Sequence, residues 1–87
     1  MNPKPDLAVP LVHLNGTSRA ELLEGYSDAV RALHHAGRAL AKAAPNARDY
    51  YPLGPGAFAK AADQHEARMA KLREVINELE AVAMAIE

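Results

Sequence analysis

The sequence predicts an all-α protein: a long antiparallel helical hairpin with an extended N-terminal arm, assembling into a homo-oligomeric helical bundle. Two stretches of the 87-residue chain repeat apolar residues at alternating spacings of three and four, with a Pro/Gly-rich segment between them. The stretches have similar lengths, which favours antiparallel packing. Alanine supplies 19 of the 43 hydrophobic residues, so large side chains are scarce. We therefore expect so thin a hairpin to complete its burial against other copies.

One small domain with a short tail is expected from the order of these segments. We expect residues 1–8 to be a flexible tail and residues 9–87 to form a single helical-hairpin domain. Pro10 holds the apolar segment 9–14 extended, and Asn15-Gly16 then turns the chain. Ser18, with Glu21 three residues later, predicts a capping box at the start of a helix.

The first helix is predicted over about residues 19–44, because one seam of spaced residues crosses the whole stretch before Pro45 ends it. The seam consists of Leu23, Tyr26, Val30, Leu33, Gly37, Leu40 and Ala44. A loop is predicted at 45–56 and a second helix over about 57–86. Its seam consists of Phe58, Ala62, His65, Met69, Leu72, Ile76, Leu79, Ala83 and Ile86. Leu22, Val75 and Val82 lie off the seams and widen the apolar surface.

Charge is unevenly distributed along the predicted hairpin. The net charge is −1 and the pI about 6.4, which disfavours direct DNA or RNA binding through phosphate neutralisation. Residues 31–71, here called the loop end, hold seven basic and three acidic residues, a net charge of +4. The remainder, the open end, holds three basic and eight acidic residues, a net charge of −5. Two copies packed antiparallel would bring unlike charges together.

Composition also indicates the compartment. The absence of cysteine rules out a disulfide framework and any thiolate metal site, and it is typical of a cytosolic protein. No apolar run approaches the roughly 18 residues that span a bilayer. The N-terminus lacks the basic region and apolar core of a signal peptide. We expect a cytoplasmic protein with no membrane association.

The first candidate binding segment lies at the start of the first predicted helix. Free backbone N–H groups and the helix dipole favour an anion there. The same segment contains a flexible glycine, two hydroxyl groups and a guanidinium group that can bind phosphate. The residues are His13, Asn15, Gly16, Thr17, Ser18 and Arg19. The alternative is an ordinary turn and capping box with His13 exposed.

The second candidate lies in the predicted loop, which is longer than the roughly 2–8 residues that usually connect helices in a bundle. Aromatic rings can stack on a nucleobase while an arginine grips a phosphate. A carboxylate beside them could accept from a base edge or a ribose hydroxyl. The residues are Arg48, Asp49, Tyr50 and Tyr51. The alternative is a structured loop whose tyrosines cover the end of the bundle.

No catalytic or metal-binding pattern accompanies these segments. His34 and His35 point in different directions on a helix, and His65 falls on the apolar seam, where a hydrogen-bonded core histidine is the simpler interpretation. No metal-ligand spacing and no trio of nucleophile, base and orienting group is visible. A small hydrolase or transferase is therefore disfavoured, and we expect no enzyme activity, metal or cofactor.

His-Leu-Asn-Gly-Thr-Ser at 13–18, Asn-Ala-Arg-Asp-Tyr-Tyr-Pro at 46–52 and the long C-terminal helix together carry a resemblance. The chain, from about Val9 onward, resembles a family of small uncharacterised helical proteins of phages and prophages. In size and helical character it is also similar to phage-encoded sponges that sequester cyclic-nucleotide or ADP-ribose-derived immune signals. That second likeness is an analogy of architecture and implies no binding residue.

The resemblance and the two segments lead to one functional hypothesis and one alternative. The hypothesis is a phage counter-defence protein, acting in the cytoplasm of the infected or lysogenic bacterial host. It would sequester a phosphate-bearing nucleotide immune signal, without cleaving it, at sites between copies. The alternative is a helical protein-interaction adaptor or inhibitor that docks on a host protein and needs no small-molecule site.

Overall fold

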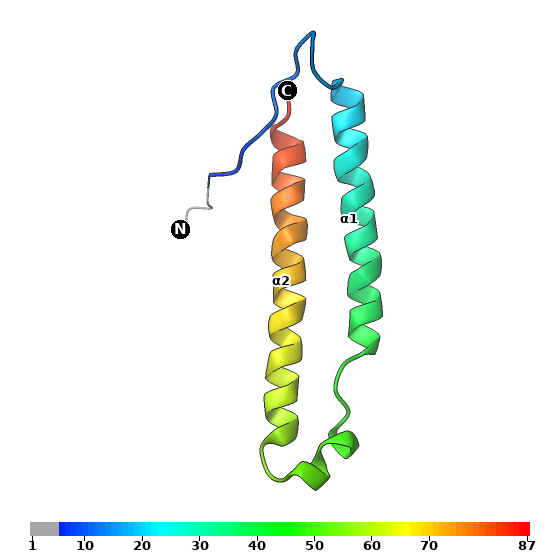
Figure 1. Cartoon of the computed structure of the whole chain (residues 1–87), viewed down its shortest axis with the longest axis vertical. Coiled ribbons are helices and arrows are strands. Elements are labelled where there is room, and N and C mark those ends of the chain that lie inside the picture. Colours follow the sequence, from blue (N-terminus) through cyan, green and yellow to red (C-terminus); the bar gives the residue numbers. More distant parts are fainter. Residues whose placement is uncertain (1–5) are drawn as a thin grey trace.

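The computed structural model describes residues 6–87, which form two long antiparallel helices joined by a structured loop (Figure 1). Helix α1 spans Arg19–Lys42 and helix α2 spans Ala57–Ala85. Two short 3₁₀ helices, η1 at Ala47–Asp49 and η2 at Tyr51–Leu53, lie in the loop. No strand occurs within this range. The predicted all-α hairpin is confirmed, and its assembly with further copies stays a prediction.

Helix α1 begins with the predicted capping box and ends earlier than predicted. The Ser18 hydroxyl accepts from the Glu21 backbone N–H at 3.1 Å, and the Glu21 carboxylate accepts from the Ser18 backbone N–H at 3.4 Å. The helix ends at Lys42 rather than 44. Ala44 precedes Pro45, whose ring disfavours helical backbone at the residue before it. The second helix ends at Ala85, one residue short of the predicted boundary.

The two predicted seams face each other along the hairpin. A Cβ added at Gly37 would lie 3.4 Å from Leu72 Cδ2, so α1 and α2 approach each other closely at these two residues. Because α1 and α2 run antiparallel, this close approach also places Leu33 at the same height along the hairpin as Ile76. Every seam residue of α1 from Leu23 to Leu40 is partly buried, whereas Ala44, beyond the helix, is exposed.

The core is thin. Among residues 6–87, the buried hydrophobic side chains are Ile76, Val82 and Ile86, which are 7%, 7% and 4% exposed. The chain exposes 6789 Å², against about 5,000 Å² expected for a compact protein of 9.3 kDa. Its radius of gyration is 18.4 Å, where about 12 Å is typical of this length. Val82, predicted to lie off the seams on the widened surface, is instead one of the most buried residues.

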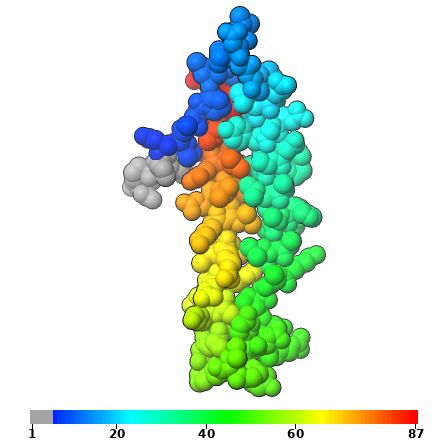
Figure 2. Space-filling view, viewed as in Figure 1, coloured from blue at the N-terminus to red at the C-terminus, as the bar shows by residue number. Residues whose placement is uncertain are grey.

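The extended N-terminal arm lies against the end of α2 (Figures 1 and 2). Residues 9–12 share a shallow cavity of about 400 Å³ with Ala85 and Glu87. The buried residues Val82 and Ile86 belong to this same end of α2. The arm and the most buried residues of α2 therefore lie at the same end of the hairpin. Of the tail predicted at 1–8, residues 1–5 lie outside the described residues.

One face of the hairpin carries a long depression between the helices, which we call the apolar groove. It consists of two cavities, of about 470 Å³ toward the open end and about 460 Å³ toward the loop end, and Glu80 lines both. The apolar side chains lining it are Leu23, Tyr26, Val30 and Leu33 of α1, and Met69, Leu72, Ile76 and Met84 of α2. The opposite face has a smaller cavity of about 350 Å³, near Leu22 and Leu79.

Candidate ligand-binding site

The two candidate binding segments lie at opposite ends of the hairpin (Figure 1). Arg19 and Lys42 bound α1, so about 35 Å of helix separates them at about 1.5 Å per residue. The loop carrying Arg48 lies beyond Lys42. Within one chain, therefore, the structure does not bring the two segments together.

At the open end, His13 and Gly16 form one local unit. The Gly16 backbone N–H donates to the His13 carbonyl at 3.1 Å, which confirms the predicted turn. The His13 imidazole lies over the glycine, since a Cβ added at Gly16 would be only 2.7 Å from His13 Nε2. A side chain at position 16 would therefore displace the ring. Asn15 and Thr17 are exposed beside it.

The start of α1 already holds a carboxylate. The Ser18 hydroxyl caps the helix, and it also lies 3.0 Å from a Glu21 carboxylate oxygen. The negative charge that the helix dipole favours at this position is thus supplied by Glu21 itself. An incoming anion here would depend on Arg19, which is exposed, and on His13 more than on the helix terminus.

At the loop end, hydrogen bonds hold a folded platform. The Asn46 side-chain oxygen accepts from the Arg48 N–H at 3.1 Å and starts η1. In η2, the Leu53 N–H donates to the Tyr50 carbonyl at 2.9 Å. Gly54 and Gly56, with φ of 102° and 87°, take left-handed backbone that other residues rarely adopt. The chain thereby turns into α2 in a defined conformation.

The two adjacent tyrosines have different environments. Tyr50 is partly buried and its ring packs on Phe58 of α2, with ring centroids 6.3 Å apart and planes tilted by 53°. Tyr51 is 76% exposed. Arg48 and Asp49 are also exposed. Tyr50 therefore anchors the loop to α2, whereas Tyr51, Arg48 and Asp49 face solvent and are available to a ligand.

Alanine substitutions should separate these two roles. Tyr50→Ala is expected to lower the free energy of unfolding by about 1–2 kcal/mol, because it removes an aromatic pair and partly buried area. Tyr51→Ala, the matched control, should stay within about 0.5 kcal/mol. Urea denaturation followed by far-UV circular dichroism, at one fixed protein concentration, measures both. Equal losses in the two variants would show that Tyr50 does not anchor the loop.

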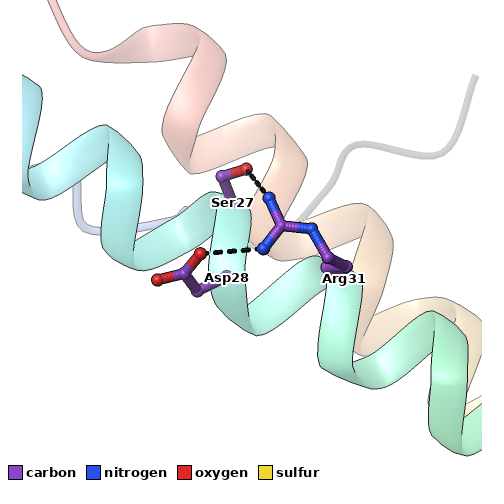
Figure 3. A network of polar contacts seen from close by, with 3 residues as sticks. All are labelled: Ser27, Asp28 and Arg31. Atoms are coloured by element: carbon purple, nitrogen blue, oxygen red, sulfur yellow. Dashed lines mark hydrogen bonds and ion pairs between the residues drawn. The ribbon is translucent and has the colours of Figure 1, made fainter.

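Ion pairs along the helices leave the charge separation intact. Arg31 Nη1 lies 3.0 Å from Asp28 Oδ1, and its second terminal nitrogen donates to Ser27 Oγ at 3.4 Å (Figure 3). Arg73 Nη2 lies 3.3 Å from Glu66 Oε2. Each pair joins one residue of the loop end to one of the open end, so the remaining charges still sum to +4 and −5. The two ends therefore keep opposite net charges.

The histidines and acids do not gather into a centre. Within residues 6–87, no three His, Asp or Glu side chains are close enough to hold a metal ion. His65 is partly buried in the α2 seam, and His34 lines the apolar groove. No polar or charged side chain in that range is buried. The candidate binding residues therefore lie on two exposed surfaces, one at each end of the hairpin. Each surface has one arginine, and neither is an enclosed pocket.

These observations define the class of protein: an elongated all-helical hairpin with an open apolar face and candidate binding residues at both ends. No family model, no curated protein and no solved structure matches the chain. Over residues 6–87, neither helix combines the length and apolar character needed to cross a bilayer.

Proposed function

We propose that this chain is a non-enzymatic, homo-oligomeric binding protein that sequesters a phosphate-bearing nucleotide at sites shared between copies. The proposal rests on the placement of exposed Arg19 and of exposed Arg48 and Tyr51 at opposite ends of one stiff hairpin. In an antiparallel pair, Arg19 of one copy approaches Arg48 and Tyr51 of the other. Two guanidinium groups and the Tyr51 ring then face the same ligand. The guanidinium groups can bind its phosphates, and the ring can stack on its base.

The biological role we propose is phage counter-defence in the cytoplasm of the bacterial host. Binding without cleavage would withdraw a nucleotide immune signal from the effector that it activates. The support is the resemblance of residues 13–18 and 46–52 to the phage and prophage family, with the small size and helical character of the chain. Most residues of both motifs are exposed on the folded hairpin.

A helical adaptor or inhibitor that docks on a host protein is the second candidate. The apolar groove favours it, because the groove presents Leu23, Val30 and Met84 to an incoming helix, and Met84 is 87% exposed. This function would use the face of the hairpin rather than its ends.

A thermal-shift screen against cyclic dinucleotides, cyclic trinucleotides and ADP-ribose derivatives tests the proposal. A ligand present at 100 times its Kd should stabilise the protein by about 2.7 kcal/mol. The corresponding nucleosides without phosphate are the matched controls and should give no shift. Recovery of the intact ligand after denaturation supports sequestration. A chemically altered ligand would indicate an enzyme and overturn the proposal, and no shift with any phosphorylated compound would favour the adaptor.

A further inference from the structure

We infer that the apolar groove is covered by the same groove of a second copy, running antiparallel, so that two hairpins form a four-helix bundle. Among the cavities described between the helices, the two that form the groove, of about 470 and 460 Å³, adjoin on one face, and the one described on the opposite face is about 350 Å³. The proposed nucleotide site requires such a partner. The dimer inferred here is argued from the groove and the charges alone, and it can be tested in the absence of a ligand.

The elongated chain exposes enough surface to supply a dimer interface. The chain exposes 6789 Å², about 1,800 Å² more than a compact protein of its mass. A standard interface buries about 800 Å² on each partner, so the excess is sufficient. Met84, at 87% exposure, is the most exposed large apolar side chain in the groove. A monomer would leave Met84 in water and the other apolar side chains of the groove, apart from the buried Ile76, only partly covered.

Charge selects the direction of the second copy. A parallel pair would place two loop ends, each of net charge +4, against each other. An antiparallel pair places each loop end against an open end of net charge −5. Unlike charges stabilise the antiparallel arrangement and like charges disfavour the parallel one. Because the surfaces are identical, the antiparallel pair closes with two-fold symmetry.

The groove residues also set the register. On α1 the groove extends from residue 23 to residue 41. The centre of the groove is therefore near the height along the hairpin at which Leu33 and Ile76 lie opposite each other. From Ile76, Glu80 lies about 6 Å toward the open end and Arg73 about 4.5 Å toward the loop end, both in the groove lining. A two-fold axis through this level places each Glu80 beside the Arg73 of the second copy. Arg73 is already paired with Glu66, but both side chains are largely exposed and reorient at little cost.

The same register aligns the remaining apolar groups and the ends of the hairpins. Met84 lies about 12 Å from the central level on one side and Met69 about 10 Å on the other, so each Met84 packs against the Met69 of the second copy. Arg19 lies about 21 Å from that level. The loop begins beyond Lys42, about 13 Å away, and reaches Ala57, about 28 Å away. Arg19 and the opposing loop therefore come to matching heights.

Sedimentation equilibrium of the ligand-free protein tests the interface. The wild-type chain should sediment as a dimer, at twice its 9.3 kDa, at micromolar concentration. Met84→Asp places a charge in the groove and should raise the dimer Kd by at least about 100-fold, because an unpaired charge is buried on association. Val75→Asp is the matched control, since Val75 is 43% exposed on the same helix and lines none of the described cavities. This variant should remain dimeric.

Exchanging the charges of Arg73 and Glu80 tests the register. Both side chains are exposed, so these variants are expected to fold. Arg73→Glu and Glu80→Arg should each weaken the dimer about tenfold, and the double variant should return to within about threefold of wild type. Far-UV circular dichroism checks that every variant keeps its helices. A monomeric wild type, an unaffected Met84→Asp or a Val75→Asp that dissociates equally would overturn the interface. A double variant weaker than either single one would overturn the register.

Discussion

Replacing Ile76 by alanine should lower the free energy of unfolding by about 3 kcal/mol, within the range of about 2–5 kcal/mol known for such truncations. Ile76 is 7% exposed and lies at the level of Leu33, in the middle of the contact between the helices. Truncation removes buried area from this contact and leaves a cavity between the helices. Urea denaturation at one fixed protein concentration measures the loss, since association also contributes to stability.

Val75→Ala is the control for this prediction. Val75 precedes Ile76 in the same helix and is 43% exposed, so its truncation removes much less buried area. We expect a loss below about 1 kcal/mol. Similar losses at the two positions would contradict the assignment of Ile76 to the contact between α1 and α2.

Mixing two inactive variants should restore ligand binding if the proposed sites are shared between copies. Arg19→Ala and Arg48→Ala should each abolish binding of the nucleotide identified in the screen, because each removes one guanidinium from every site. When the variants are denatured together and refolded, half of the dimers combine one chain of each kind. Every mixed dimer has one doubly damaged site and one intact site, so about a quarter of all sites recover.

The stoichiometry of binding, measured by calorimetry, reports this recovery. Each variant refolded alone is the control and should bind nothing. Differently tagged chains, purified through both tags in sequence, show that mixed dimers formed. Mixed dimers without any recovered binding would mean that each chain builds its own site, or that the two arginines do not act on one ligand.

Much of the fold follows from local rules that the sequence displays. The capping box of Ser18 and Glu21 and the spacing of the seam residues define the helices to within two residues. The end of α1 was placed too late because the prediction took Pro45 as the limit, whereas its ring already disfavours helix at Ala44. Val82 was misplaced for another reason. Val82 lies in the last turns of α2, near the end at which the arm docks, and no periodicity within the helix shows where a distant segment docks.

The candidate site was predictable in its residue types but not in their roles. Sequence alone does not distinguish Tyr50 from Tyr51, because only the fold places Phe58 beneath one ring. Nor does it show that Glu21 occupies the helix start, although the capping box that it forms was visible. An apolar surface left over for other copies was expected from the scarcity of large side chains. The position of the apolar groove was not predicted, because the spacing of the seam residues does not show on which side of the seam the two helices leave a depression.

We also expect the loop to set the order in which this hairpin forms. Its aromatic contact joins Tyr50 to Phe58, eight residues apart, whereas the contact of Gly37 with Leu72 closes thirty-five residues. The entropy lost on closing a segment grows with its length, so we expect pairing to start at the loop and to proceed toward the open end. Substitutions near Gly54 and Gly56 should then act mainly on the folding rate, and those near Met84 on the unfolding rate. Residues 9–12 share a cavity with Ala85, more than seventy residues away, so we expect the arm to dock last.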